Sequence, residues 1–179
     1  MSGIYLPDLK AVVRMACNAI GAGGDNAVVL VTGTLLCEGG HDTVNLFQRT
    51  GRAPTDKIAW GAGQMEPATH DDCWHNFIVN RPALKLAMTK LAGNSGPLAA
   101  RLIFDLRYAA AMTRVRYMRD AAPVPALGDD DAMAAYWKRV YNTVKGAGVA
   151  DSVHAALFTL ARQTVETDIS RLVSQEPTT

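Results

Sequence analysis

The chain has 179 residues, of which 49% are apolar and 20% charged, and its formal net charge is +1. These values are typical of one soluble globular domain, so we expect a single domain over residues 1–179. A near-neutral charge argues against binding of nucleic acid by bulk electrostatics, although a local basic patch stays compatible with it. Three widely spaced cysteines without a CxxC pair favour free core thiols.

The first part of the chain predicts two helices separated by glycines. Residues 7–20 begin with Pro-Asp and continue with apolar positions at helical spacing, and the glycines at 21–24 end this pattern. The apolar run that follows fits the spacing of a helix as well as that of a strand, but its length favours a helix over 25–38. Gly33 within it either weakens that helix or marks a close crossing with another.

Residues 39–63 are polar and rich in turn formers. So long an irregular segment in a compact domain is often functional, or it contains a small hairpin. The piece with the most strand-like composition is TVNLFQ, at residues 43–48. We therefore expect one long polar loop that could contain a small hairpin.

Helical patterns resume after Pro67 and continue through most of the remaining chain. Residues 97–118 are alanine-rich and apolar on most faces, which predicts one long central helix. Three aspartates at 129–131 mark a further helix start, where acids complement the helix dipole. The last helix is expected at 151–174. The predicted fold class is therefore mainly α, with the helices packed around one core.

Glu38 closes the second predicted helix, directly before two glycines. A carboxylate there faces the negative end of the helix dipole, and apolar neighbours add desolvation if it points inward. Both effects raise the pKa of a carboxyl group, which is what a general acid near neutral pH requires. The alternative is a solvated glutamate at a frayed helix end.

Three segments then occur in a suggestive order: LLCEGG at 35–40, GAGQMEPAT at 61–69 and AYWKRVYNTVKGAG at 135–148. Together they resemble the lysozyme-like superfamily, specifically its soluble lytic transglycosylase type. The similarity spans about residues 25–148, most of the chain. The version QMEPATHDDCW is also similar to peptidoglycan-degrading or virion-associated proteins of bacteriophages.

The resemblance implies a lysozyme-like helical domain that cleaves the bond between N-acetylmuramic acid and N-acetylglucosamine, for phage infection or lysis. It implies that Glu38 is catalytic and that Gln64, Tyr141 and Asn142 bind the glycan, with no cofactor and no metal. The spacing of the histidines also argues against a metal site, because the two histidines of HDDCWH at 70–75 do not share a helix face.

A second carboxylate would distinguish hydrolysis of the glycan from the lytic transglycosylase reaction. Glycoside hydrolases, whether they retain or invert configuration, usually use two carboxylates. Asp42, Asp56 and Glu66 are candidates, but nothing in the sequence positions any of them against Glu38. This favours a lytic transglycosylase over a lysozyme-type hydrolase, and Glu66 is expected to serve the start of a helix.

The chain also departs from the family pattern: Gly39 replaces a serine, Ala62 and Gly63 replace Leu-Met, and Glu66 replaces an apolar residue. These departures support an alternative, a structural virion component of the tail that keeps the fold with a degenerate site. The expected partners are peptidoglycan strands and other virion proteins. We expect neither a membrane span nor a signal peptide, and therefore a protein of the virion or host cytoplasm that acts at the cell wall or periplasm.

Overall fold

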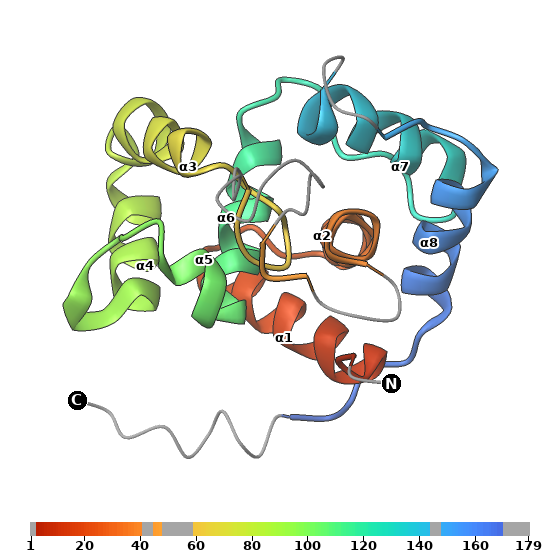
Figure 1. Ribbon diagram of the computed structural model, residues 1–179, viewed down its shortest axis with the longest axis horizontal. Coiled ribbons are helices and arrows are strands. Elements are labelled where there is room, and N and C mark those ends of the chain that lie inside the picture. Colours follow the sequence, from red (N-terminus) through yellow and green to blue (C-terminus); the bar gives the residue numbers. More distant parts are fainter. Residues whose placement is uncertain (1–2, 41–44, 48–58, 144–147, 170–179) are drawn as a thin grey trace.

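The computed structural model describes residues 3–40, 45–47, 59–143 and 148–169. This part of the chain is mainly α-helical, which confirms the predicted class (Figure 1). None of its helices is long and apolar enough to cross a membrane. The elements are α1 (Leu6–Ala19), α2 (Asp25–Gly39), α3 (Pro67–Cys73), the π-helical turn η1 (Trp74–Ile78), α4 (Pro82–Ala92), the 3₁₀ turn η2 (Gly93–Ser95), α5 (Arg101–Phe104), α6 (Leu106–Met118), α7 (Asp130–Trp137), the π-helical turn η3 (Lys138–Asn142) and α8 (Ser152–Gln163).

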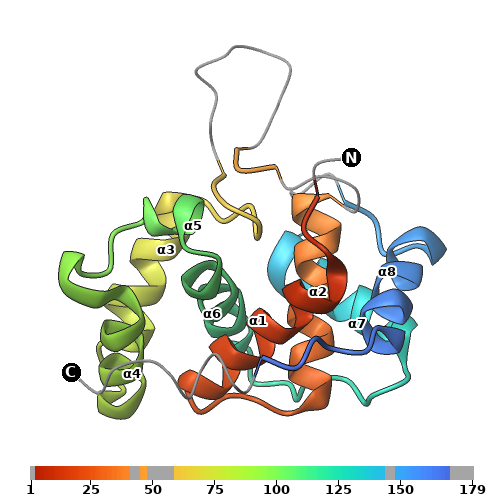
Figure 2. The ribbon, with the colours of Figure 1, turned by 90° about the horizontal axis from the view of Figure 1, so that it is seen from below.

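Helices α2 and α6 form the centre of the molecule, and α1 packs against both (Figures 1 and 2). On one side, α3 and α4 pack against α6. On the other side, α7 and α8 pack against α2 and against each other. The two sides have separate groups of buried apolar side chains, and Tyr141 packs against both groups. The region around this tyrosine is therefore where the two sides meet.

Helix α2 is buried on nearly all faces, because every residue over 27–36 is buried. Its glycine, Gly33, lies against α8, and a Cβ atom at this position would come within 2.3 Å of Phe158 Cδ1. Of the two alternatives left open for Gly33, the structure therefore shows the close helix crossing. This tight contact fixes where the end of α2, with Glu38, lies relative to α8.

The long helix predicted over 97–118 is wrong in two respects, because residues 97–100 are not helical and the structure breaks the remainder at Asp105. This residue has φ −122° and ψ 97°, outside the helical region, and its side chain accepts a hydrogen bond of 3.1 Å from the backbone N–H of Tyr108. It therefore caps α6, as aspartate commonly does. Helix α6 itself is buried along most of its length, as expected.

The helix predicted over 151–174 begins as expected, but it ends at Gln163. Residues 164–169 are not helical, since α1 binds them. The Lys10 ammonium donates to the Thr164 carbonyl at 2.8 Å, and the Arg14 guanidinium pairs with Glu166 at 2.6 Å. These tertiary bonds replace the helical ones, and residues 170–174 lie outside the described residues.

Only part of the long polar loop is described. Two isolated antiparallel bridges join Phe47 to Trp60 and Trp60 to Met65, and the described residues contain no regular strand. Half of the strand-like piece predicted at 43–48 lies outside the described residues, and residues 45–47 contain only the isolated bridge at Phe47. What is described is a tight turn over 61–64, closed by reciprocal backbone hydrogen bonds between Trp60 and Met65 of 2.9 and 3.1 Å.

Candidate active site

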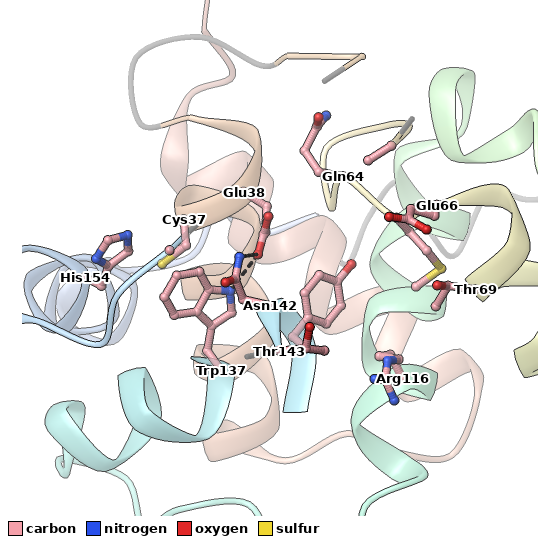
Figure 3. Close-up of a pocket in the computed structure, with 14 residues that line it drawn as sticks. Cys37, Glu38, Gln64, Glu66, Thr69, Arg116, Trp137, Asn142, Thr143 and His154 are labelled. Atoms are coloured by element: carbon pink, nitrogen blue, oxygen red, sulfur yellow. Dashed lines mark hydrogen bonds between the residues drawn. The ribbon is translucent and has the colours of Figure 1, made fainter. Parts of the chain in front are cut away.

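A pocket of about 510 Å³ opens where the two sides of the molecule meet (Figure 3). All four residues predicted for the site line it. The lining residues are Cys37, Glu38, Ala59, Gln64, Met65, Glu66, Thr69, Arg116, Trp137, Tyr141, Asn142, Thr143, Gly148 and His154. They come from the end of α2, the turn before α3, α3 itself, α6, the α7–η3 segment and α8. The fold thus brings together segments that are far apart in the sequence.

Glu38 is half-buried in this pocket, at the C-terminal end of α2. One carboxyl oxygen, Oε1, accepts hydrogen bonds from the Trp137 indole N–H at 2.9 Å and from the Asn142 amide at 3.2 Å. Burial raises the pKa of the Glu38 carboxyl above its ordinary value, and these two hydrogen bonds oppose the rise. The raised pKa follows the direction expected from the sequence, with burial as its main cause.

The orientation of Asn142 is fixed by a neighbour on the same turn. The Lys138 ammonium donates to Asn142 Oδ1 at 2.8 Å and to the Thr143 carbonyl at 2.7 Å. The amide oxygen is thereby occupied, so the NH₂ group faces Glu38. This turn is π-helical and ends at Thr143 with φ +64°, a strained backbone of the kind found at functional sites. Asn142 therefore contacts the predicted acid, whereas the sequence suggested that it would contact the sugar.

Trp137 and His154 also line the pocket, and the sequence reasoning missed both. Their rings stack at a centroid distance of 4.7 Å, and His154 Nδ1 lies 2.7 Å from a carboxylate oxygen of Asp151. The stack orients the indole that binds Glu38. A buried Trp N–H requires an acceptor, and this rule is the signal that could have linked Trp137 to a carboxylate.

Gln64 lies in the tight turn with φ +45°, which non-glycine residues seldom adopt. Both hydrogens of its amide are used within the loop, because Nε2 donates to the carbonyls of Asn45 and Gly61 at 2.6 Å each. Gln64 was predicted to bind the glycan, but its amide group has no hydrogen left to donate to a ligand. Within the described residues only its Oε1 is left to accept a hydrogen bond from a ligand.

Tyr141 connects the pocket wall to the same turn. Its hydroxyl donates to the Gly63 carbonyl at 2.7 Å and lies 3.3 Å from Thr113 Oγ1. A Cβ atom at Gly63 would lie 2.8 Å from this hydroxyl, so any larger residue would disturb the contact. In this structure Tyr141 holds the loop in place, and it makes no hydrogen bond to Glu38.

Gly39 and Ala62, two of the departures from the family pattern, contact each other. A Cβ atom at Gly39 would lie only 2.6 Å from the Ala62 carbonyl oxygen. A serine at position 39 would therefore push the turn away from α2. The glycine allows the loop to close against the helix end that carries Glu38, so these departures form one consistent packing arrangement.

The opposite wall of the pocket carries Glu66, Thr69 and Arg116 (Figure 3). Glu66 occupies the N-cap position of α3, as expected from the sequence, but its side chain makes no capping hydrogen bond. The carboxylate is exposed and lines the pocket instead. Among the described residues, two carboxyl groups line the pocket, one half-buried and one exposed. The other two candidates from the sequence, Asp42 and Asp56, lie outside the described residues.

No protein-family model matches the chain, and no curated protein or solved structure matches it significantly. The chemistry of the site therefore rests on its own geometry. Glu38 is a carboxyl group with a raised pKa in a pocket large enough for a ligand, and it is oriented by Trp137 and Asn142. A carboxyl group with a raised pKa is suited to give a proton and then take one back. Among the described residues no group of three potential metal ligands occurs.

Proposed function

We propose that this protein is a peptidoglycan lytic transglycosylase with a lysozyme-like helical fold, and that Glu38 is its acid and base. The observation that carries the proposal is the half-buried Glu38 carboxyl in a pocket shared with Gln64, Tyr141 and Asn142. The resemblance of the three sequence segments supports peptidoglycan as the substrate. The segment with Gln64 is similar to phage proteins, which favours a virion-associated or lysis enzyme.

In the proposed reaction the protonated Glu38 carboxyl donates its proton to the glycosidic oxygen between N-acetylmuramic acid and N-acetylglucosamine. The bond from that oxygen to the muramic C1 breaks, and the sugar's N-acetyl group stabilises the positive centre. The ionised Glu38 then removes the proton from the muramic 6-hydroxyl, whose oxygen bonds to C1. The product is a 1,6-anhydro ring, no water is consumed, and Glu38 is protonated again.

Trp137 and Asn142 support this cycle through their hydrogen bonds to Glu38 Oε1. These bonds favour the ionised carboxylate, whereas burial favours the protonated acid. A group that acts first as an acid and then as a base needs both forms, and the site contains one influence that favours each of them. The bonds also leave the second carboxyl oxygen free of protein partners within the described residues.

One observation favours a second candidate, a lysozyme-type hydrolase. Glu66 lies across the pocket from Glu38, and a carboxylate in this position could activate a water molecule. The reaction would then add water at C1 and leave a reducing end. In that case Glu66 as well as Glu38 would be required for cleavage.

Digestion of purified peptidoglycan separates these possibilities, with products analysed by mass spectrometry. For the transglycosylase we expect anhydro-muropeptides from the wild type, no products from Glu38→Gln, and retained activity in the matched variant Glu66→Gln. Reducing-end products that disappear in both variants would establish the hydrolase instead. Wild-type protein that releases no products, or Glu38→Gln protein with full activity, would refute the enzymatic proposal and favour a structural role in the virion.

A further inference from the structure

Among the residues that the structure describes, Arg116 has no hydrogen-bonding partner, in contrast to three other arginines, Arg114, Arg119 and Arg139. Arg119 and Arg139 form ion pairs with aspartates, and Arg114 donates to the Ala22 carbonyl at 3.0 Å. Arg116 is half-buried and makes no hydrogen bond or ion pair with any residue that the structure describes. A half-buried guanidinium without an acceptor leaves several strong donors available to a ligand.

The position of Arg116 makes this observation relevant to the pocket. The residue lies on α6 and lines the wall opposite Glu38, together with Thr69 of α3 (Figure 3). Glu66 lines the same wall without pairing with Arg116. A ligand that reaches Glu38 and fills the pocket therefore meets an unpaired guanidinium and a hydroxyl on the far side.

We propose that Arg116 and Thr69 form a carboxylate-binding subsite, so that the pocket prefers an anionic glycan over a neutral one. The planar guanidinium matches a carboxylate through two parallel hydrogen bonds, and the threonine hydroxyl adds a third donor. This inference rests on the proposed function, and it narrows the substrate class to glycans that carry a carboxylate. In peptidoglycan such a carboxylate lies on the stem peptide, or on the lactyl group of muramic acid where the peptide has been removed, because the peptide is otherwise joined to that lactyl group by an amide bond.

Glu66 acts against this subsite. Its exposed carboxylate lies on the same wall and repels an incoming anion. The charge of Glu66 therefore weakens carboxylate binding, and its removal strengthens it. We therefore expect neutralisation of Arg116 to lower the affinity for a carboxylate ligand and neutralisation of Glu66 to raise it.

Equilibrium binding tests the subsite in a Glu38→Gln background, where turnover is blocked. Three tetrasaccharide probes are compared by calorimetry: a peptidoglycan fragment with stem peptides, the same fragment after amidase removal of the peptides, and neutral chitotetraose. We expect Arg116→Gln to weaken binding of a carboxylate probe by about tenfold or more, because the variant loses a hydrogen bond to a charged group. Binding of chitotetraose should stay unchanged.

Three further variants control for trivial effects. Arg116→Lys keeps the charge but loses the planar fork, so it should bind with intermediate affinity. Arg139→Gln removes the same charge from a side chain that is outside the pocket, and it should bind like the parent protein. Glu66→Gln should bind the carboxylate probe more tightly than the parent. Thermal unfolding of each variant establishes that it is folded.

The outcomes separate the subsite from the proposed reaction. Loss of affinity for only one carboxylate probe identifies the stem peptide or the lactyl group as the anion bound. Equal weakening of all three probes in Arg116→Gln, or no weakening at all, overturns the subsite even if wild-type protein cleaves peptidoglycan. An Arg116-dependent carboxylate preference in a protein that releases no products keeps the subsite and refutes the reaction.

Discussion

Substitution of Gly33 by alanine tests whether the contact between α2 and α8 depends on a missing methyl group. The new Cβ atom would lie 2.3, 2.5 and 2.9 Å from three ring atoms of Phe158, which is fully buried. Non-bonded carbon atoms prefer separations of about 3.5–4.0 Å, so the methyl group overlaps the ring by roughly 1 Å. The ring or the whole of α8 must therefore move.

Two opposing free energies set the size of the effect. Alanine in place of glycine inside a helix stabilises it by up to about 1 kcal/mol. Overpacking of a close-packed core costs about 1–3 kcal/mol. We therefore expect Gly33→Ala to lower the free energy of unfolding by up to about 2 kcal/mol, and the melting temperature by roughly 4–8 °C for a chain of this size.

Chemical denaturation of a double-mutant cycle checks the explanation. Phe158→Ala removes the ring atoms and costs about 3–5 kcal/mol by itself. In this background Gly33→Ala should become stabilising, by up to about 1 kcal/mol, because only the helix propensity remains. If Gly33→Ala is as stable as the wild type, or destabilises both backgrounds equally, then the Phe158 contact does not explain why glycine occurs here.

Two further predictions concern pH. Because burial raises the pKa of Glu38, this carboxyl group stays protonated to a higher pH in the folded protein than in the unfolded chain, and its contribution to stability falls as pH rises above about 4.3. Glu38→Gln should therefore have a higher free energy of unfolding than the wild type at pH 7, and urea denaturation should show that the difference disappears near pH 4. A difference that stays constant with pH would contradict this. Burial also lowers the pKa of His70, which bonds Tyr108, so wild-type stability should fall below about pH 6.5. Replacement by His70→Gln should flatten this dependence, and an unchanged slope would refute it.

Much of the fold could be predicted because local signals at helix ends do not depend on distant residues. Helix starts were predicted at Asp129 and Asp151, and both residues are N-caps in the structure, because their side chains accept hydrogen bonds from the backbone N–H groups of Ala132 and His154. Asp105, where the long predicted helix is broken, is an N-cap of the same kind. The sequence reasoning missed it because the apolar pattern continues across the aspartate.

The roles of the site residues were harder to predict than their positions. Glu38 and Asn142 both line the pocket, but the partner of Asn142 is the carboxyl of Glu38, and this depends on a π-helical turn that the helical spacing did not indicate. In a regular helix Trp137 and Tyr141 would occupy one face. The widened turn rotates the later residues relative to Trp137, and the two side chains have different partners.

The sequence by itself determined the helical class, most helix starts and the presence of a glutamate at the end of an apolar helix, because capping and periodicity act over a few residues. Only the tertiary structure decided the rest. Lys10 and Arg14 of α1 bind the residues after Gln163, and this ends the last helix early. The carboxyl pKa likewise depends on burial by segments about 100 positions away, from which Trp137 and Asn142 reach Glu38. Such contacts follow from packing between distant parts of the chain, and no local pattern encodes them.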